Sequence, residues 1–273
     1  MGRGDFGFDG LYSLNAVNQW IAVINSNLNA ASRTGYKSTK VKFRGGVTDQ
    51  VRRPFGPLLG IQIPETTLQV DETSIDFSQG SVVSSTEPTH LAIQGDGFFV
   101  LAPDIDTDGT PITANGFYYT RDGEFHTIYT PTGIRLVHST GMYLVTSAGG
   151  GVEFDAQNDL VREDDPTAVA TNAGFNGNVF NEVNLIGFIA PNFLRFSRYG
   201  STVFEVSGNP ADVGQYTVTT GAARVVAQSL ESSNSSLSQT LPELSLAQKF
   251  FSAVSKVISV HQTNLDTVIN LIR

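Results

Sequence analysis

Large apolar residues recur at every seventh position near the end of the chain. The series runs through Leu237, Leu244, Phe251, Ile258, Leu265 and Ile272, with Ala247 and Val254 beside it. Apolar residues at this period form the seam of a helix that packs along a partner helix. The pattern therefore predicts one long helix over the last forty residues. Pro242 must then lie either in its first turn or at a kink.

A second apolar stripe near the start of the chain supplies a partner. Apolar residues repeat there at three and four residues, and no charged residue occurs between Leu11 and Ser32. This spacing predicts a helix from about Leu11 to Ala31, ended by Gly35. We expect the two terminal helices to pair and to serve as the assembly interface of the protein. The residues expected at that interface are Leu14, Val17, Ile21, Ile24, Leu28, Leu244, Phe251, Val254, Ile258 and Leu265.

The middle of the chain, residues 67–229, alternates strand-like runs with turn residues. Leu91–Ile93 and Phe98–Val100 are predicted strands, with a tight turn at Gly95–Gly97. Asp122 and Gly123 predict a hairpin turn between two aromatic strands. The fold class is therefore α+β, with terminal helices paired as a coiled coil and an irregular, mainly antiparallel β domain between them.

Three domains follow from this pattern. Residues 1–36 and 233–273 are expected to form a helical domain, and 67–232 a β domain. Residues 37–66 are expected to be an extended connector. The connector is the most basic part of the chain, and this basic character fits either a solvated linker or an arm that docks on acidic neighbours. Its basic residues are Lys37, Lys40, Lys42, Arg44, Arg52 and Arg53.

Charge and composition exclude several classes of function. The net charge of −9 argues against binding to nucleic acid or anionic lipid, which both require a basic surface. The absence of cysteine excludes a disulfide framework, a cysteine-ligated metal and a thiol nucleophile. No stretch is apolar enough to predict membrane insertion.

Candidate chemistry is sparse. Asp104, Asp106 and Asp108, followed by Gly109, match the opening of a calcium-binding loop. The bidentate Glu expected at the twelfth position is replaced by Asn115, so a solvated hairpin tip is the alternative. The histidines are scattered, and no nucleophile or phosphate loop is recognisable. We expect no cofactor and no enzymatic activity.

Four stretches carry a resemblance to a known family. The segment ending the first predicted helix contains Asn27, Leu28, Thr34, Gly35 and Lys37 at the spacing of an N-terminal signature. The motif LAIxGxGFF is matched by Leu91, Ile93, Gly95, Gly97, Phe98 and Phe99. A later motif is matched by Arg121, Asp122 and Gly123, and the link to the last helix by Gln228, Glu231, Ser233 and Asn234. All four resemble the bacterial flagellar rod and hook proteins.

This resemblance implies a structural axial protein of the flagellar basal body. In that family the terminal helices form an inner tube and the β domain an outer layer, and the tube transmits torque. The expected partners are copies of the same chain, other rod and hook subunits, and the flagellar type III export apparatus, with a periplasmic location and no cleavable signal peptide. The long connector favours the distal rod. A secreted β-rich adhesin, a phage-tail-like structural protein and a calcium-dependent binding module remain alternatives.

Overall fold

The chain folds into two units that are discontinuous in sequence. The computed structural model describes residues 6–45, 49–50, 62–63, 67–104, 116–130, 133–145, 153–154, 160–161, 183, 185–207, 213–218 and 223–272. The helical unit comprises Met1–Ala30, Thr39–Asp76 and Ser235–Arg273, and the β unit comprises Ala31–Ser38 and Phe77–Asn234. This division assigns 31–38 to the β unit and 39–76 to the helical unit, and so differs there from the predicted one.

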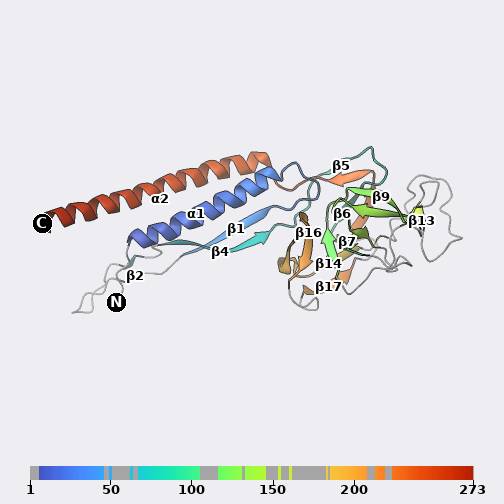
Figure 1. Cartoon of the computed structure of the whole chain (residues 1–273), viewed down its shortest axis with the longest axis horizontal. Coiled ribbons are helices and arrows are strands. Elements are labelled where there is room, and N and C mark those ends of the chain that lie inside the picture. Colours follow the sequence, from blue (N-terminus) through green and yellow to red (C-terminus); the bar gives the residue numbers. More distant parts are fainter. Residues whose placement is uncertain are drawn as a thin grey trace. The chain divides into compact units, whose positions relative to one another are not determined.

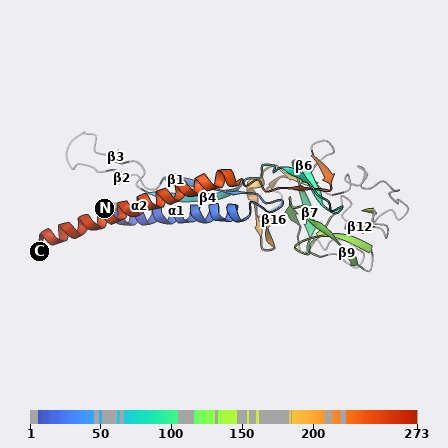
Figure 2. The same ribbon diagram turned by 90° about the horizontal axis from the view of Figure 1, so that it is seen from above.

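Two helices from opposite ends of the sequence dominate the helical unit. Helices α1 (Phe6–Asn29) and α2 (Leu237–Ile272) run side by side in both views (Figures 1 and 2). They are antiparallel, because Gly10 lies against Ile258 while Ser235 donates a hydrogen bond to the Asn27 carbonyl. The predicted pairing of the terminal helices, flanking mainly antiparallel sheet, is therefore confirmed.

Helix α2 is longer than its partner. At a rise of about 1.5 Å per residue, its 36 residues span about 54 Å, against about 36 Å for the 24 residues of α1. The last turns of α2 extend past the start of α1 (Figure 1). All residues from Gln262 to Leu271 are correspondingly exposed.

Pro242 lies inside α2 rather than at its first position. Its missing N–H removes one hydrogen bond near the start of the helix. Leu237 and Leu241, on this initial segment, are both more than half exposed, so the predicted seam does not extend back to Leu237. Along α2, burial begins with Thr240 and Leu244, and Ala247 is fully buried.

An antiparallel ribbon packs on α1. It consists of β1 (Thr39–Gly45) and β4 (Leu68–Ile75) and continues through β2 (Asp49–Gln50) and β3 (Gln62–Ile63). Half-buried and exposed residues alternate along β1, and the Phe43 ring meets Trp20 edge-on at 5.5 Å. The described part of the predicted connector is thus a strand with one face on a helix.

The basic residues of this ribbon pair within the chain. On β1, Lys40, Lys42 and Arg44 form ion pairs with Asp76, Glu72 and Asp71 respectively. These pairs leave little unbalanced charge on the ribbon for an acidic neighbour to recognise. Arg52 and Arg53 lie outside the described residues.

Among the described residues of the β unit, eleven strands form one antiparallel sheet. Its main path runs β13-β12-β10-β11-β7-β8-β16-β15, while β14 pairs with β7 and β17, and β9 pairs with β10. The strands are β7 (Phe98–Ala102), β8 (Tyr118–Thr120), β9 (Phe125–Thr130), β10 (Gly133–His138), β11 (Tyr143–Leu144), β12 (Glu153–Phe154), β13 (Leu160–Val161), β14 (Leu185–Phe188), β15 (Leu194–Ser197), β16 (Gly200–Val206) and β17 (Gln215–Thr217). A short 3-10 helix, η3 (Pro191–Phe193), precedes β15.

Two small sheets complete the unit. Strand β6 (Leu91–Gly95) pairs with β18 (Ala223–Ala227), and β5 (Val82–Ser84) pairs with β19 (Ser229–Glu231). The core between the sheets is apolar and aromatic, with Phe99 and Phe125 edge-to-face at 5.3 Å. Both small sheets therefore bring strands that lie near the end of the sequence against strands from its first half.

The predicted hairpin at Asp122–Gly123 is wrong. Strand β8, before it, pairs with β7 and β16, whereas β9, after it, pairs with β10. The dipeptide instead passes close to β6, because a Cβ on Gly123 would lie 1.5 Å from the Leu91 carbonyl oxygen. The Leu91 N–H donates to the Gly123 carbonyl at this crossing. The glycine is needed for close approach rather than for a reverse turn.

The contact between the ribbon and α1 is open to a direct test. We expect Phe43→Ala to lower the free energy of unfolding of the helical unit by about 1–2 kcal/mol, because Phe43 is half-buried against Trp20. Trp20 is the only tryptophan of the chain, so its fluorescence in a urea titration reports on this unit alone. Lys42→Ala, on the exposed side of the same strand, should change the midpoint little; equal effects of the two variants would contradict the packing.

Candidate functional site

A cluster of three buried charges joins both ends of the β unit's sequence. Lys37, Arg121 and Glu231 form this ion cluster, and their side chains are between 0% and 4% exposed. Lys37 follows α1 in the sequence, Arg121 comes from the middle of the chain, and Glu231 is the last residue of β19. The cluster therefore links three segments that are far apart in sequence.

Glu231 is the hub of the ion cluster. Its Oε1 accepts hydrogen bonds from Lys37 Nζ at 2.6 Å and from the Gly80 N–H at 2.8 Å. Its Oε2 accepts from Arg121 at 3.2 Å. Since a buried carboxylate is costly unless it is paired and hydrogen-bonded, these three donors make its burial possible.

Arg121 is held by several kinds of contact. One guanidinium nitrogen reaches Glu231, and another donates to the Gly95 carbonyl at 2.9 Å. The guanidinium carbon lies 5.3 Å from the centre of the Phe98 ring, within cation–π range. Burial lowers the pKa of Arg121, and the Glu231 carboxylate partly offsets that shift.

Backbone ties surround the ion cluster. The Gly35 N–H donates to the Glu231 carbonyl at 2.7 Å, and Lys37 Nζ also donates to the Ser78 carbonyl at 2.8 Å. Asn234 accepts from the Ser38 N–H at 2.7 Å and donates to the Ser78 carbonyl. Gly35 has a φ of +63°, and a Cβ there would lie 2.3 Å from the Asp122 nitrogen. Only glycine suits both constraints.

The structure thus brings several predicted motif residues together. Gly35, Lys37, Gly95, Phe98, Arg121 and Asp122 all lie in or against the ion cluster. Leu91, Ile93 and Phe99 are core residues. Gly97 has a φ of +134°, a backbone conformation that favours glycine. Asn27 lies in the helical unit, where its side chain exchanges hydrogen bonds with the backbone of Thr39. Sequence reasoning matched Glu231 to the family without assigning it as the hub.

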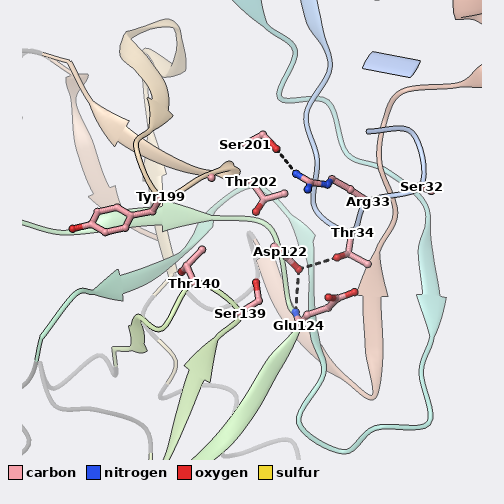
Figure 3. A pocket seen from close by; sticks show the side chains of 11 residues that line it. Ser32, Arg33, Thr34, Asp122, Glu124, Ser139, Thr140, Tyr199, Ser201 and Thr202 are labelled. Carbon is pink, nitrogen blue, oxygen red and sulfur yellow. Dashed lines mark hydrogen bonds between the residues drawn. The ribbon is translucent and has the colours of Figure 1, made fainter. Parts of the chain in front are cut away.

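A polar pocket of about 390 Å³ lies beside the segment 32–34 (Figure 3). Arg33 donates to the Ser201 hydroxyl at 2.8 Å across it, and Asp122 accepts from the Thr34 hydroxyl and the Glu124 N–H. The remaining lining is mostly hydroxyl groups. Small-molecule sites are mainly apolar with a few polar anchors, so this lining does not favour one.

His138 and Thr140 adjoin the pocket but do not form a catalytic pair. His138 is fully buried, and its Nδ1 accepts from the N–H of Thr140 two residues on, which is a local turn contact. Its Nε2 lies 3.3 Å from Asp122 Oδ2 without hydrogen-bond geometry. The contact between His138 and Thr140 stabilises the turn after β10.

Most of the predicted interface residues are buried or half-buried within the single chain. Val17 and Ile24 are buried, Leu14, Ile21, Leu28, Leu244, Phe251, Val254 and Ile258 are half-buried, and Leu265 is 47% exposed. Their predicted role between copies stays a prediction. Further exposed apolar residues lie elsewhere on α2.

Sequence reasoning missed a second apolar stripe on α2. We call it the outer face; all its residues are exposed, and they recur at helical spacing. They are Leu246, Phe250, Val257, Val260, Val268 and Leu271. A second heptad through Phe250, Val257 and Leu271 is the signal that could have found it.

The candidate calcium loop receives no support from the described residues. Asp104 is exposed, and Asp106 and Asp108 lie outside the part of the chain that the structure describes. Among described residues, no three His, Cys, Asp or Glu gather as a metal site would require. No described helix is long and apolar enough to cross a membrane.

The fold thus has two parts: paired terminal helices, and a mainly antiparallel β unit with a motif-built ion cluster. Comparison with known proteins confirms the predicted resemblance to flagellar rod and hook proteins. The chain is 27% identical to the flagellar basal-body rod protein FlgG of Borreliella burgdorferi, over 93% of both chains. It is 26% identical to FlgG of Bacillus subtilis, over 97% of this chain and 98% of the relative.

A shorter stretch matches the hook. Over 56 residues, 20% of this chain, it is 50% identical to the hook protein FlgE of Helicobacter pylori, of which this stretch covers 7%. No family model matches the chain. The near-full-length similarity is therefore to rod proteins, and a shorter stretch of higher identity is to a hook protein.

Removing the carboxylate of the ion cluster should destabilise the β unit more than removing one of its cations. Glu231→Gln leaves two cations buried without their carboxylate, so we expect a loss of about 3–5 kcal/mol in the free energy of unfolding of the β unit. Lys37→Met should cost less, because Arg121 and the Gly80 N–H still pair with Glu231. Near-UV circular dichroism in a denaturant titration measures both.

Lys42→Met is the matched control for a lysine ion pair. Its partner is Glu72, and both side chains are more than half exposed, so the loss should be about 0–1 kcal/mol. A Glu231→Gln variant no less stable than this control would show that the ion cluster does not hold the β unit together.

Proposed function

We propose that this protein is a structural subunit of the flagellar rod, whose copies polymerise through their terminal helices into a tube that transmits torque. The near-full-length similarity to two FlgG rod proteins supports the rod assignment. By that analogy the partners are further copies of this chain and other rod and hook subunits, and the location is the periplasmic part of the basal body.

The outer face of α2 is the observation that carries the proposed assembly. Val257 is 64% exposed and Leu271 80%, on a helix whose seam already packs on α1. Large exposed apolar surface on a soluble chain marks a site of protein contact. We infer that a second copy of the chain covers the outer face. The face lies on the helix that already packs on α1, and its apolar residues repeat at the heptad spacing by which helices pair.

The side of α2 that faces away from the seam with α1 is polar. The hydroxyl of Ser252 donates to the Gln248 carbonyl, that of Thr263 to Ser259, and that of Thr267 to Thr263, at 2.8–3.0 Å. A hydroxyl that donates to its own helix can be covered by another protein at a lower desolvation cost. Neighbouring copies could therefore pack on more than one side of α2.

The free energy available from burying the outer face favours a polymer over a dimer. Covering six half-exposed side chains would stabilise a contact by roughly 5–9 kcal/mol, at about 1.5–3 kcal/mol for each fully buried residue. Association costs about 4–15 kcal/mol in lost freedom and side-chain ordering. One such contact is therefore marginal, and a stable assembly needs each copy to contact several others.

Phe250→Asp tests the proposal. A carboxylate in the middle of the outer face should abolish assembly of the purified chain, followed by sedimentation and negative-stain electron microscopy. The fold should persist, because Phe250 is 48% exposed and does not lie in the seam.

Ser259→Asp adds the same charge on the polar side of the same helix and is the matched control. It should assemble more readily than Phe250→Asp. If Phe250→Asp assembles as well as the unsubstituted chain, the outer face is not the contact between copies.

A further inference from the structure

The sequence passes between the helical unit and the β unit at four crossings. They fall at 30/31, 38/39, 76/77 and 234/235. The segment 31–38 belongs to the β unit, although α1 precedes it and β1 follows it. These four crossings are the only covalent connections between the two units.

Residues beside the crossings are tied to one another inside the β unit. Ser38 is the last residue before one crossing and Asn234 the last before another, and the Ser38 N–H donates to the Asn234 side chain. Ser78, two residues past a third crossing, accepts from both Asn234 and Lys37. At the fourth, Thr34 forms a β-bridge with Ser232.

The ion cluster lies among these ties. Lys37 is one residue before Ser38, and Glu231 is three residues before Asn234. The 2.6 Å ion pair between them joins the chain that leaves α1 to the chain that enters α2. Arg121 fixes the pair to the body of the β unit through the Gly95 carbonyl and Phe98.

Buried charges suit a task that requires one arrangement. Apolar side chains of the same volume can give equal stability, but in some proteins buried ionic groups select one arrangement, because every other arrangement leaves a buried charge unpaired. The ion cluster would therefore fix where the crossings lie relative to one another more strictly than an apolar core could.

We propose that Lys37, Arg121 and Glu231 are positioning residues for assembly: they hold the four crossings in a single arrangement, from which the terminal helices can be presented to neighbouring copies. This inference rests on the proposed function. A purely structural role would instead make the ion cluster dispensable wherever the β unit stays folded.

The deciding variant replaces all three charges by apolar residues, Lys37→Met, Arg121→Met and Glu231→Met together. Removing the whole set leaves no unpaired buried charge, so the β unit should stay folded and lose less stability than in Glu231→Gln, with the remaining loss coming from the unpaired Gly80 N–H and Gly95 carbonyl. Hydrogen exchange measured by mass spectrometry should become at least tenfold faster at Gly35, Ser38 and Gly80, whose amides face the ion cluster and its ties, and stay within twofold in β6.

Assembly of this triple variant should fall at least tenfold in pelleted protein, with Lys42→Met as a control that assembles normally. Normal assembly of a folded triple variant would overturn the inference, and so would unchanged exchange at those amides. If the unsubstituted chain itself does not assemble, the proposed function fails, independently of the ion cluster.

Asn234→Ala keeps the test decisive if the triple variant does not fold. It removes ties to Ser38 and Ser78 without exposing or burying a charge. We expect faster exchange at Ser38 and at least threefold less assembly, while β6 stays protected. Normal assembly of this variant, with Ser38 exchange accelerated, would also overturn the inference.

Discussion

One buried carboxylate sets the constraint on which the β unit depends. Glu231 must receive Lys37 from the start of the unit and Arg121 from its middle, and it does so within hydrogen-bonding distance of both. Gly35, Gly80 and Gly123 then follow as necessities, because each lies where a Cβ would collide with a neighbouring backbone. Residues from motifs that looked separate in the sequence thus meet at one packed site.

The helical unit follows a different physical rule. Its helix seam is apolar, and its ribbon pairs exposed cations on β1 with carboxylates on β4 and just after it. Burial inside the unit uses one side of α2 and leaves another apolar side exposed. The β unit is thus specified by directional polar contacts, while the helical unit is specified by apolar surface and has some of it left over for neighbours.

The sequence was informative where a pattern is local. Heptads predicted both helices and their pairing, and strand-like runs predicted most of the β unit. The sequence misled at Asp122–Gly123. This dipeptide is usual in hairpin turns, but here Gly123 allows the backbone to pass close to β6. It was also misread at Lys40–Arg44: the glycines and prolines further along suggested a connector, although Val41 and Phe43 alternate with charges as a strand on a helix requires. Long-range polar pairing, such as Lys37 with Glu231, leaves no periodic signal at all.

We propose a subunit whose β unit fixes the chain crossings and whose α2 offers an apolar face to the next copy. The most direct test uses the absence of cysteine from the chain. Val257→Cys and Ser259→Cys are labelled with a maleimide before and after assembly; both positions are exposed in the single chain. The account predicts that assembly protects Val257→Cys strongly and Ser259→Cys much less. Equal labelling of Val257→Cys in the free and assembled states would contradict it.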